Sequence, residues 1–213
     1  MHDIPDDFDT PRTLVDGLGR LLFDDTRGTP ERLVGRAIVL LGLIAWTWML
    51  ARASIESNLV GQSFLHLIDL PFHEAGHIVF MPFGEFLMSL GGSLMQLIVP
   101  ATFTIAFLTR HRDPFGAAVT TWWLGENLLD LAPYINDARA LELVLLGGKT
   151  GAEVEGHDWE KILTILGWLP YDHTLARLAR FSGALIMLGA CAWALTLLIR
   201  QRDQFQREDS AGS

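Results

Sequence analysis

The chain has 213 residues, half of them hydrophobic, and a formal charge of −9 at pH 7. This length is typical of a single domain. The acidic balance provides no basic surface for phosphates and excludes nucleic acid as a partner. The one cysteine, Cys191, excludes a disulfide within the chain.

Residues 1–32 form a polar N-terminal tail ahead of the first apolar block. Thr10 followed by Pro11 is typical of the start of a helix. Apolar residues then recur at helical spacing over 11–23, which predicts a short amphipathic helix. The pattern allows this helix to lie either on a membrane surface or against the protein itself.

Three long apolar blocks follow the tail. Residues 86–109 and 181–199 contain no charged residue over 24 and 19 positions. A helix needs about 20 apolar residues to cross the hydrocarbon layer of a bilayer. The third block, 37–51, is shorter, but the arginines at its two ends, Arg36 and Arg52, could extend their side chains to the membrane interface. The blocks therefore predict membrane-spanning helices.

The predicted fold is all-α: a multi-pass transmembrane helical bundle of the cell membrane over 33–200, with the lipid bilayer around it, followed by a polar C-terminal tail over 201–213. Basic residues occur in the N-terminal tail, at 110–112 and after 199. Lys and Arg normally gather on the cytoplasmic side, yet five full spans would put the two tails on opposite sides. One polar segment, 58–81 or 116–132, is therefore expected to be re-entrant, and we favour a cytoplasmic N-terminus.

The segment 58–81 carries the run His-Glu-Ala-Gly-His at positions 73–77. Two histidines four residues apart project from one face of a helix and can bind a single Zn²⁺. Glu74, beside the first histidine, can take a proton from a zinc-bound water whose pKa the metal lowers toward about 7. Ionisable residues in an apolar segment are costly and usually functional. The motif predicts a zinc metallohydrolase whose cofactor is Zn²⁺, in an intramembrane or membrane-proximal site; the alternative is a set of buried polar residues that bond one another.

A catalytic zinc site usually has three protein ligands and keeps its fourth position for water. The residues alone leave the third ligand open, because carboxylates and imidazoles occur in several later segments. His66 is another candidate: it lies seven residues before His73, with Pro71 between them. The candidates are His66, Glu126, Asp130, Asp137, His157 and Asp158.

The run from Phe72 to His77 inside an apolar segment resembles the site-2 protease family of intramembrane zinc metalloproteases. In that family a glycine-rich helix follows the zinc helix, and the stretch from Gly91 to Gln96 is similar to it, with glutamine in place of the family's asparagine. Asn127, Pro133 and Asp137 are similar in order to a later Asn-x-x-Pro and Leu-Asp-Gly pattern. The resemblance covers roughly 70–140, and only the first motif is specific.

The resemblance implies roles for five residues. His73, His77 and Asp137 would bind Zn²⁺, Glu74 would act as the catalytic base, and Asn127 would hold the substrate backbone. The substrate would be a peptide or a membrane protein. The implied function is a zinc metalloprotease that carries out intramembrane proteolysis.

Two departures from the family pattern affect the third ligand. Asp137 is followed by Ala138 rather than by glycine, and Asp130 stands where a proline is typical, which makes Asp130 the second choice. Two other functions stay open on the sequence: a membrane-anchored metallopeptidase whose site opens to the soluble face, and a non-catalytic membrane scaffold that retains the fold of the zinc site. The sequence leaves the substrate and the oligomeric state open.

Overall fold

The computed structural model describes residues 13–24, 29–154 and 156–211, and over these ranges the chain is all-α, as predicted. The described residues form seven α-helices, with short 3₁₀ or π turns between α3 and α4, α4 and α5, and α6 and α7. The only strand-like feature of the described residues is one isolated bridge between Val144 and Thr150. The helices are α1 (Leu14–Phe23), α2 (Pro30–Arg52), α3 (Phe64–Phe80), α4 (Glu85–Ala106), α5 (Pro114–Asn136), α6 (Asp158–Leu166) and α7 (Asp172–Ala211).

Local sequence explains where these helices begin. Thr29 caps α2 by accepting from the Arg32 N–H, and a proline occupies the first helical position. Asp113 caps α5 in the same way, again ahead of a proline. The helix expected after Thr10 begins instead at Leu14, with Thr13 as its cap; Thr10 itself lies outside the described residues.

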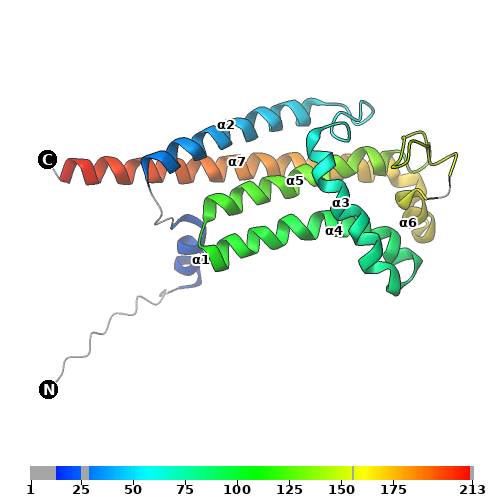
Figure 1. Cartoon of the computed structure of the whole chain (residues 1–213), viewed down its shortest axis with the longest axis horizontal. Coiled ribbons are helices and arrows are strands. Elements are labelled where there is room, and N and C mark those ends of the chain that lie inside the picture. The colour runs from blue at the N-terminus through cyan, green and yellow to red at the C-terminus, as the bar shows by residue number, and fades with distance from the viewer. Residues whose placement is uncertain (1–12, 25–28, 155, 212–213) are drawn as a thin grey trace, which may run out of the picture.

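Four helices, α2, α4, α5 and α7, run side by side along the long axis of the molecule, whereas α3 crosses them (Figure 1). The core lies where α2, α5 and α7 meet, around Trp122, Leu129 and Met187. Gly125 and Gly183 let α5 and α7 approach closely, since a Cβ at either position would collide with the backbone oxygen of the other. This packing fixes the position of α5, which carries many of the polar residues near the site.

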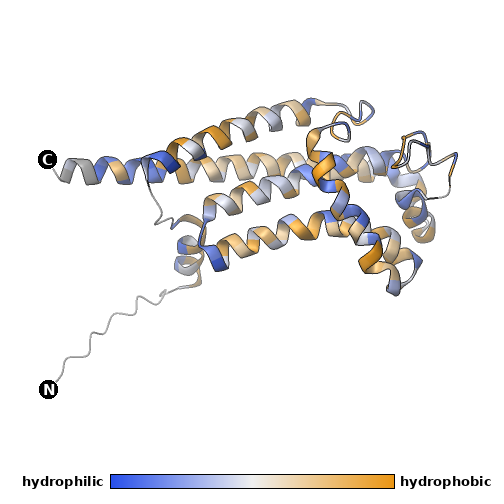
Figure 2. Ribbon diagram, in the orientation of Figure 1, coloured by the Kyte–Doolittle hydropathy of each residue, from blue (hydrophilic) through white to orange (hydrophobic). Residues whose placement is uncertain are grey.

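Apolar residues predominate along α2, α4 and the middle of α7 (Figure 2). Three helical segments are long enough and apolar enough to cross a membrane: Pro30–Arg52, Glu85–His111 and Leu169–Arg207. Large apolar side chains such as Ile38, Trp48 and Ile105 project outward from them, as expected of helices that face lipid. α3 has only 17 residues and is not among the three.

The amphipathic helix α1 lies against the protein at one end of the bundle. The Trp193 indole N–H donates to the Leu22 carbonyl oxygen at 2.9 Å, and the Arg200 guanidinium lies over the Phe23 ring at 4.5 Å. The opposite face of α1 exposes Leu14 and Leu18. Packing against the protein, one of the two predicted roles, is therefore present, and contact of the exposed leucines with a membrane surface stays a prediction.

Candidate metal centre

His73 and His77 lie on the same face of α3, with their ring centroids 4.9 Å apart. α3 is continuous from Phe64 to Phe80 and is not interrupted at Pro71. The two histidines, four residues apart, therefore lie one helical turn apart, as the motif predicts. α4 approaches this face at Gly91 and Gly92. A Cβ at Gly92 would lie 2.6 Å from the His73 Nε2 atom, so glycine keeps the space in front of the imidazoles open.

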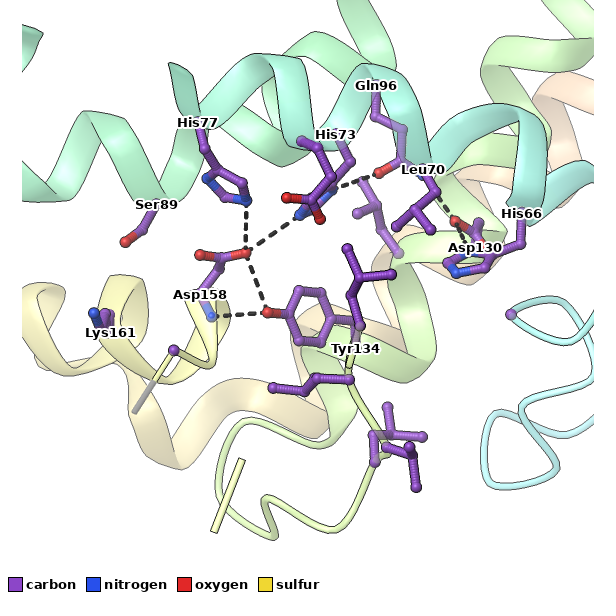
Figure 3. A pocket seen from close by; sticks show the side chains of 18 of the residues that line it. His66, Leu70, His73, His77, Ser89, Gln96, Asp130, Tyr134, Asp158 and Lys161 are labelled. Atoms are coloured by element: carbon purple, nitrogen blue, oxygen red, sulfur yellow. Dashed lines mark hydrogen bonds and ion pairs between the residues drawn. The ribbon is translucent and has the colours of Figure 1, made fainter. Parts of the chain in front are cut away.

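Asp158, the first residue of α6, completes the group. Its Oδ2 atom lies 3.2 Å from the Nε2 atom of His73 and 3.2 Å from the Nε2 atom of His77. The three candidate ligand atoms all lie within 4.8 Å of one another. Figure 3 shows the two rings and the carboxylate converging from α3 and α6. Two imidazoles and one carboxylate form a ligand set typical of a catalytic metal site with one position left for water or substrate.

The second nitrogen of each ring is held by an acceptor. The Nδ1 atom of His77 lies 2.8 Å from the Met88 carbonyl oxygen, and the Nδ1 atom of His73 lies 2.9 Å from Gln96 Oε1. Because the Gln96 amide nitrogen donates to Asp130 Oδ2 at 2.8 Å, its oxygen must face His73. Both Nδ1 atoms therefore carry hydrogen, as the ring nitrogens opposite a metal normally do.

This hydrogen bonding provides a test of whether the residues fit a metal. In the neutral rings, the Nε2 lone pairs of His73 and His77 point at a carboxylate oxygen, which is also an acceptor. Three acceptors that converge in this way need a cation between them, either a proton or a metal ion. The donor set fits a divalent metal, and the Nδ1 contacts fix both rings in the orientation that binding requires.

The charges of the site favour a cation. Burial would raise the pKa of Asp158, but hydrogen bonds to the His73 and His77 rings outweigh burial and lower its pKa to about 2. The hydrogen bond to Asp158 also raises the pKa of His77 to about 9. The carboxylate is therefore ionised, and it stabilises positive charge on the ring nitrogens that face it.

Tyr134, near the end of α5, fixes Asp158 in place. The Tyr134 hydroxyl donates to Asp158 Oδ2 at 3.1 Å and accepts from the Asp158 backbone N–H at 2.9 Å. His157 caps α6, its Nδ1 atom accepting from the Glu160 N–H at 3.1 Å. The start of α6 is thus tied to α5 and aimed at α3.

The structure brings Asp158, and not Asp137 or Asp130, to the two histidines. Asp137 accepts hydrogen bonds from the backbone N–H groups of Glu142 and Leu143 at 2.9 and 3.0 Å, so its carboxylate closes the turn that follows α5. This use of the carboxylate corrects the placement of Asp137 implied by the resemblance. Asp158 was among the candidates that the sequence left open.

Asp130, the second choice, is joined to His73 only through Gln96, by two successive hydrogen bonds. Its carboxylate oxygens contact His66 Nδ1 at 2.9 and 3.0 Å, and one of them accepts from the Gln96 amide. A continuous chain of polar contacts thus joins His66, Asp130, Gln96 and His73. The sequence contains no signal for this chain, because its members come from three helices that only the fold brings together.

Asn127 is fully buried inside the bundle, where its amide nitrogen donates to the Trp123 carbonyl oxygen at 2.9 Å. It is not among the residues that line the cavity at the candidate metal centre. The structure therefore does not bring Asn127 to the place where a substrate backbone would lie.

A cavity of about 480 Å³ opens in front of the candidate metal centre. One wall is formed by α3, with His73, Glu74 and His77, and Glu74 is exposed. The opposite wall consists of the loop residues 143–146 together with Val154 and Gly156, and Lys161 of α6 also lines the cavity. The cavity therefore combines a possible cation site, an acidic group beside it and an apolar loop wall.

Comparisons with protein-family models, with curated proteins and with solved structures find no match to this chain.

Proposed function

We propose that the chain is a zinc-dependent metallopeptidase of a membrane, similar to the site-2 protease family, that hydrolyses peptide bonds in membrane or membrane-proximal substrates. One observation carries the proposal: the Nε2 atoms of His73 and His77 converge on one oxygen of Asp158, each at 3.2 Å. Glu74 follows the first of these histidines and lines the same cavity. A metal and an adjacent carboxylate are the two components of hydrolysis by this motif.

Each residue of the centre would have a distinct task in the reaction. A bound Zn²⁺ would supply a Lewis acid that polarises the scissile carbonyl and acidifies a water. Glu74 would accept the proton of the attacking water and return it to the leaving amine. Tyr134 holds Asp158, and Gln96 holds His73, so both act by positioning.

The composition of the cavity supports a site that opens to the soluble face. Asn58 and Gly61, from the connection before α3, line it together with the loop residues Val154 and Gly156. These four residues lie outside the three segments that could cross a membrane, whereas Met88, Ser89 and Gln96, which also line the cavity, lie in Glu85–His111. Of the two peptidase functions that the sequence left open, the lining supports the membrane-anchored form, which would act on peptide chains at the membrane surface.

The proposal is tested by the metal content of protein purified in detergent. We expect about one Zn²⁺ per chain by mass spectrometry, because the donor set offers three ligands for one ion. Removal of the metal with a chelator should abolish cleavage of an unstructured peptide library, and added Zn²⁺ should restore it. Two imidazoles and a carboxylate can also bind Fe²⁺. Protein that binds iron and not zinc, or zinc-loaded protein that cleaves no peptide, would contradict the proposal.

Substitution of Gln96 by leucine is expected to weaken Zn²⁺ binding about 10–100-fold, the usual effect of removing a hydrogen-bond partner from a metal-binding histidine. Leucine keeps much of the side-chain volume but cannot accept the His73 Nδ1–H or donate to Asp130. Competition with a chelator of known affinity measures the change. Gln206→Leu, an exposed position on α7, is the control and should leave the affinity unchanged. Equal affinities of the two variants would show that Gln96 does not position His73.

A further inference from the structure

The two ends of the helical bundle differ in which segments they bring together. At one end, the Arg36 guanidinium donates to Gln201 Oε1 at 3.1 Å and to Asp113 Oδ1 at 3.2 Å. These contacts join the start of α2, the C-terminal part of α7 and the turn between α4 and α5. α1 packs there as well, through Trp193 and Leu22. We call this the arginine end (Figure 1).

The candidate metal centre lies at the opposite end, which we call the site end. There Arg180 donates to the Ala51 carbonyl oxygen at 2.9 Å, which joins the C-terminal end of α2 to the first turns of α7. Arg139, from the turn after α5, forms an ion pair with Asp172 at 2.7 Å. The loop residues that line the cavity also belong to this end, as does α6, which carries Asp158.

The short helix α3 determines this arrangement. Five full spans would have placed the two chain tails on opposite sides of a membrane. α3 instead crosses the site end, and the other four helices run alternately between the two ends (Figure 1). α5 is not among the three segments apolar enough to cross a membrane by themselves, but it packs against α4 and α7 and runs the length of the bundle with much of its surface buried. Counted with it, the four passages are even in number, and they return the chain to the end at which it started. The described basic residues up to the first turns of α2, those at 110–112 and those after 199 therefore all belong to the arginine end.

The basic residues are distributed unequally between the two ends. Among the described residues, the arginine end has Arg20, Arg32, Arg36, Arg110, Arg112, Arg200, Arg202 and Arg207, and in the sequence two further arginines, Arg12 and Arg27, precede α2. The site end has Arg52, Arg139, Lys149, Lys161, Arg177 and Arg180. The connections 53–63 and 81–84 at the site end contain no Lys or Arg. An excess of Lys and Arg near the ends of spanning helices marks the cytoplasmic side.

The outer surface of α3 is consistent with a position at the lipid boundary. Phe64, Leu67 and Ile78 project from it, and the following turn exposes Met81 and Phe83. The other face of α3 carries the histidines and borders the cavity whose far wall is formed by loops. The site helix would therefore have lipid on one side and an aqueous cavity on the other.

We propose that the arginine end faces the cytoplasm and that the candidate metal centre opens on the opposite, extracytoplasmic side of the membrane. The substrates are then polypeptide segments on that side, at or just outside the bilayer surface. The substrate class rests on the proposed peptidase function, whereas the sidedness rests only on the fold and on the distribution of arginines. The two can therefore fail independently.

Cysteine labelling tests the sidedness without measuring activity. The only native thiol, Cys191, is buried in α7 and is removed by Cys191→Ala. A single cysteine is then introduced at an exposed, uncharged position of each end: Ala152→Cys in the loop of the site end, or Gln206→Cys in α7 at the arginine end. A membrane-impermeant maleimide is applied to intact cells that express each full-length variant, and again after permeabilisation.

We expect Ala152→Cys to be labelled to the same extent before and after permeabilisation, and Gln206→Cys to be labelled only after it. Thr109→Cys, exposed in the π turn that follows α4, should follow Gln206→Cys. Three outcomes would overturn the proposal. They are labelling of only the arginine end in intact cells, labelling of both ends in intact cells, and labelling of neither end. If the labelling pattern is the expected one but the protein binds no Zn²⁺, the proposed function is refuted and the proposed orientation in the membrane is not.

Discussion

Replacement of Asp158 by asparagine is expected to weaken Zn²⁺ binding by more than roughly 100-fold, because loss of even a neighbouring partner of a ligand typically costs about 10–100-fold. Asp158 supplies the only carboxylate in the three-atom group formed by the described residues. Asparagine preserves the size of the side chain and can still accept the Tyr134 hydroxyl, but it removes the negative charge that faces both Nε2 atoms. Isothermal titration of metal-free protein in detergent measures the change.

Asp137→Asn is the matched comparison, because Asp137 is the third ligand that the family resemblance implies. Its carboxylate caps the backbone of the turn after α5, so we expect the variant to keep its affinity for Zn²⁺. A thermal melt of both variants separates loss of binding from loss of fold. If Asp137→Asn lost the metal and Asp158→Asn kept it, the ligand assignment drawn from the structure would be wrong.

Replacement of Glu74 by glutamine is expected to lower the rate of peptide hydrolysis about 10²–10⁴-fold, which is the usual contribution of a general base. The Zn²⁺ content should stay the same, because Glu74 is not part of the group that could hold the metal. Its side chain is exposed in the cavity beside that group. Glutamine has the same shape but cannot take a proton from water.

The measurement for Glu74→Gln is a progress curve of peptide cleavage at equal metal loading. Glu56→Gln changes an exposed glutamate in the connection between α2 and α3, outside the cavity, and should retain full activity. Metal-loaded Glu74→Gln that cleaves at the rate of the unaltered chain would rule out Glu74 as the base. Loss of metal together with loss of activity would instead point to a role for Glu74 in binding.

The parts of the candidate site that the sequence predicts depend on local periodicity. His73 and His77 share a face because a helix repeats every 3.6 residues, whatever the rest of the fold does. The glycines of α4 predict a close approach of helices for a similarly local reason, since the lack of a Cβ is visible in the sequence. Lengths of apolar blocks likewise predict the spans Glu85–His111 and Leu169–Arg207 without knowledge of their neighbours.

Other features depend on how distant segments meet. Asp137 and Asp158 are both aspartates near helix ends, and nothing in their local sequences shows which carboxylate caps a turn and which faces the histidines. The order of residues along the chain favours Asp137, whereas the packing of α6 against α4 and the Tyr134 hydrogen bonds select Asp158. The contact of Gln96 with His73 arises in the same way, from the packing of α4 beside α3.

The sequence by itself determined the helical class of this protein, its apolar spans and the pair of histidines one turn apart, because each follows from a periodicity or a length within one segment. The tertiary structure decided which carboxylate joins the histidines. It also decided that α3 crosses the end of the bundle instead of spanning it, and hence that the arginine-rich segments belong to one end. These features depend on contacts between segments far apart in the chain, where neither spacing nor hydropathy carries information.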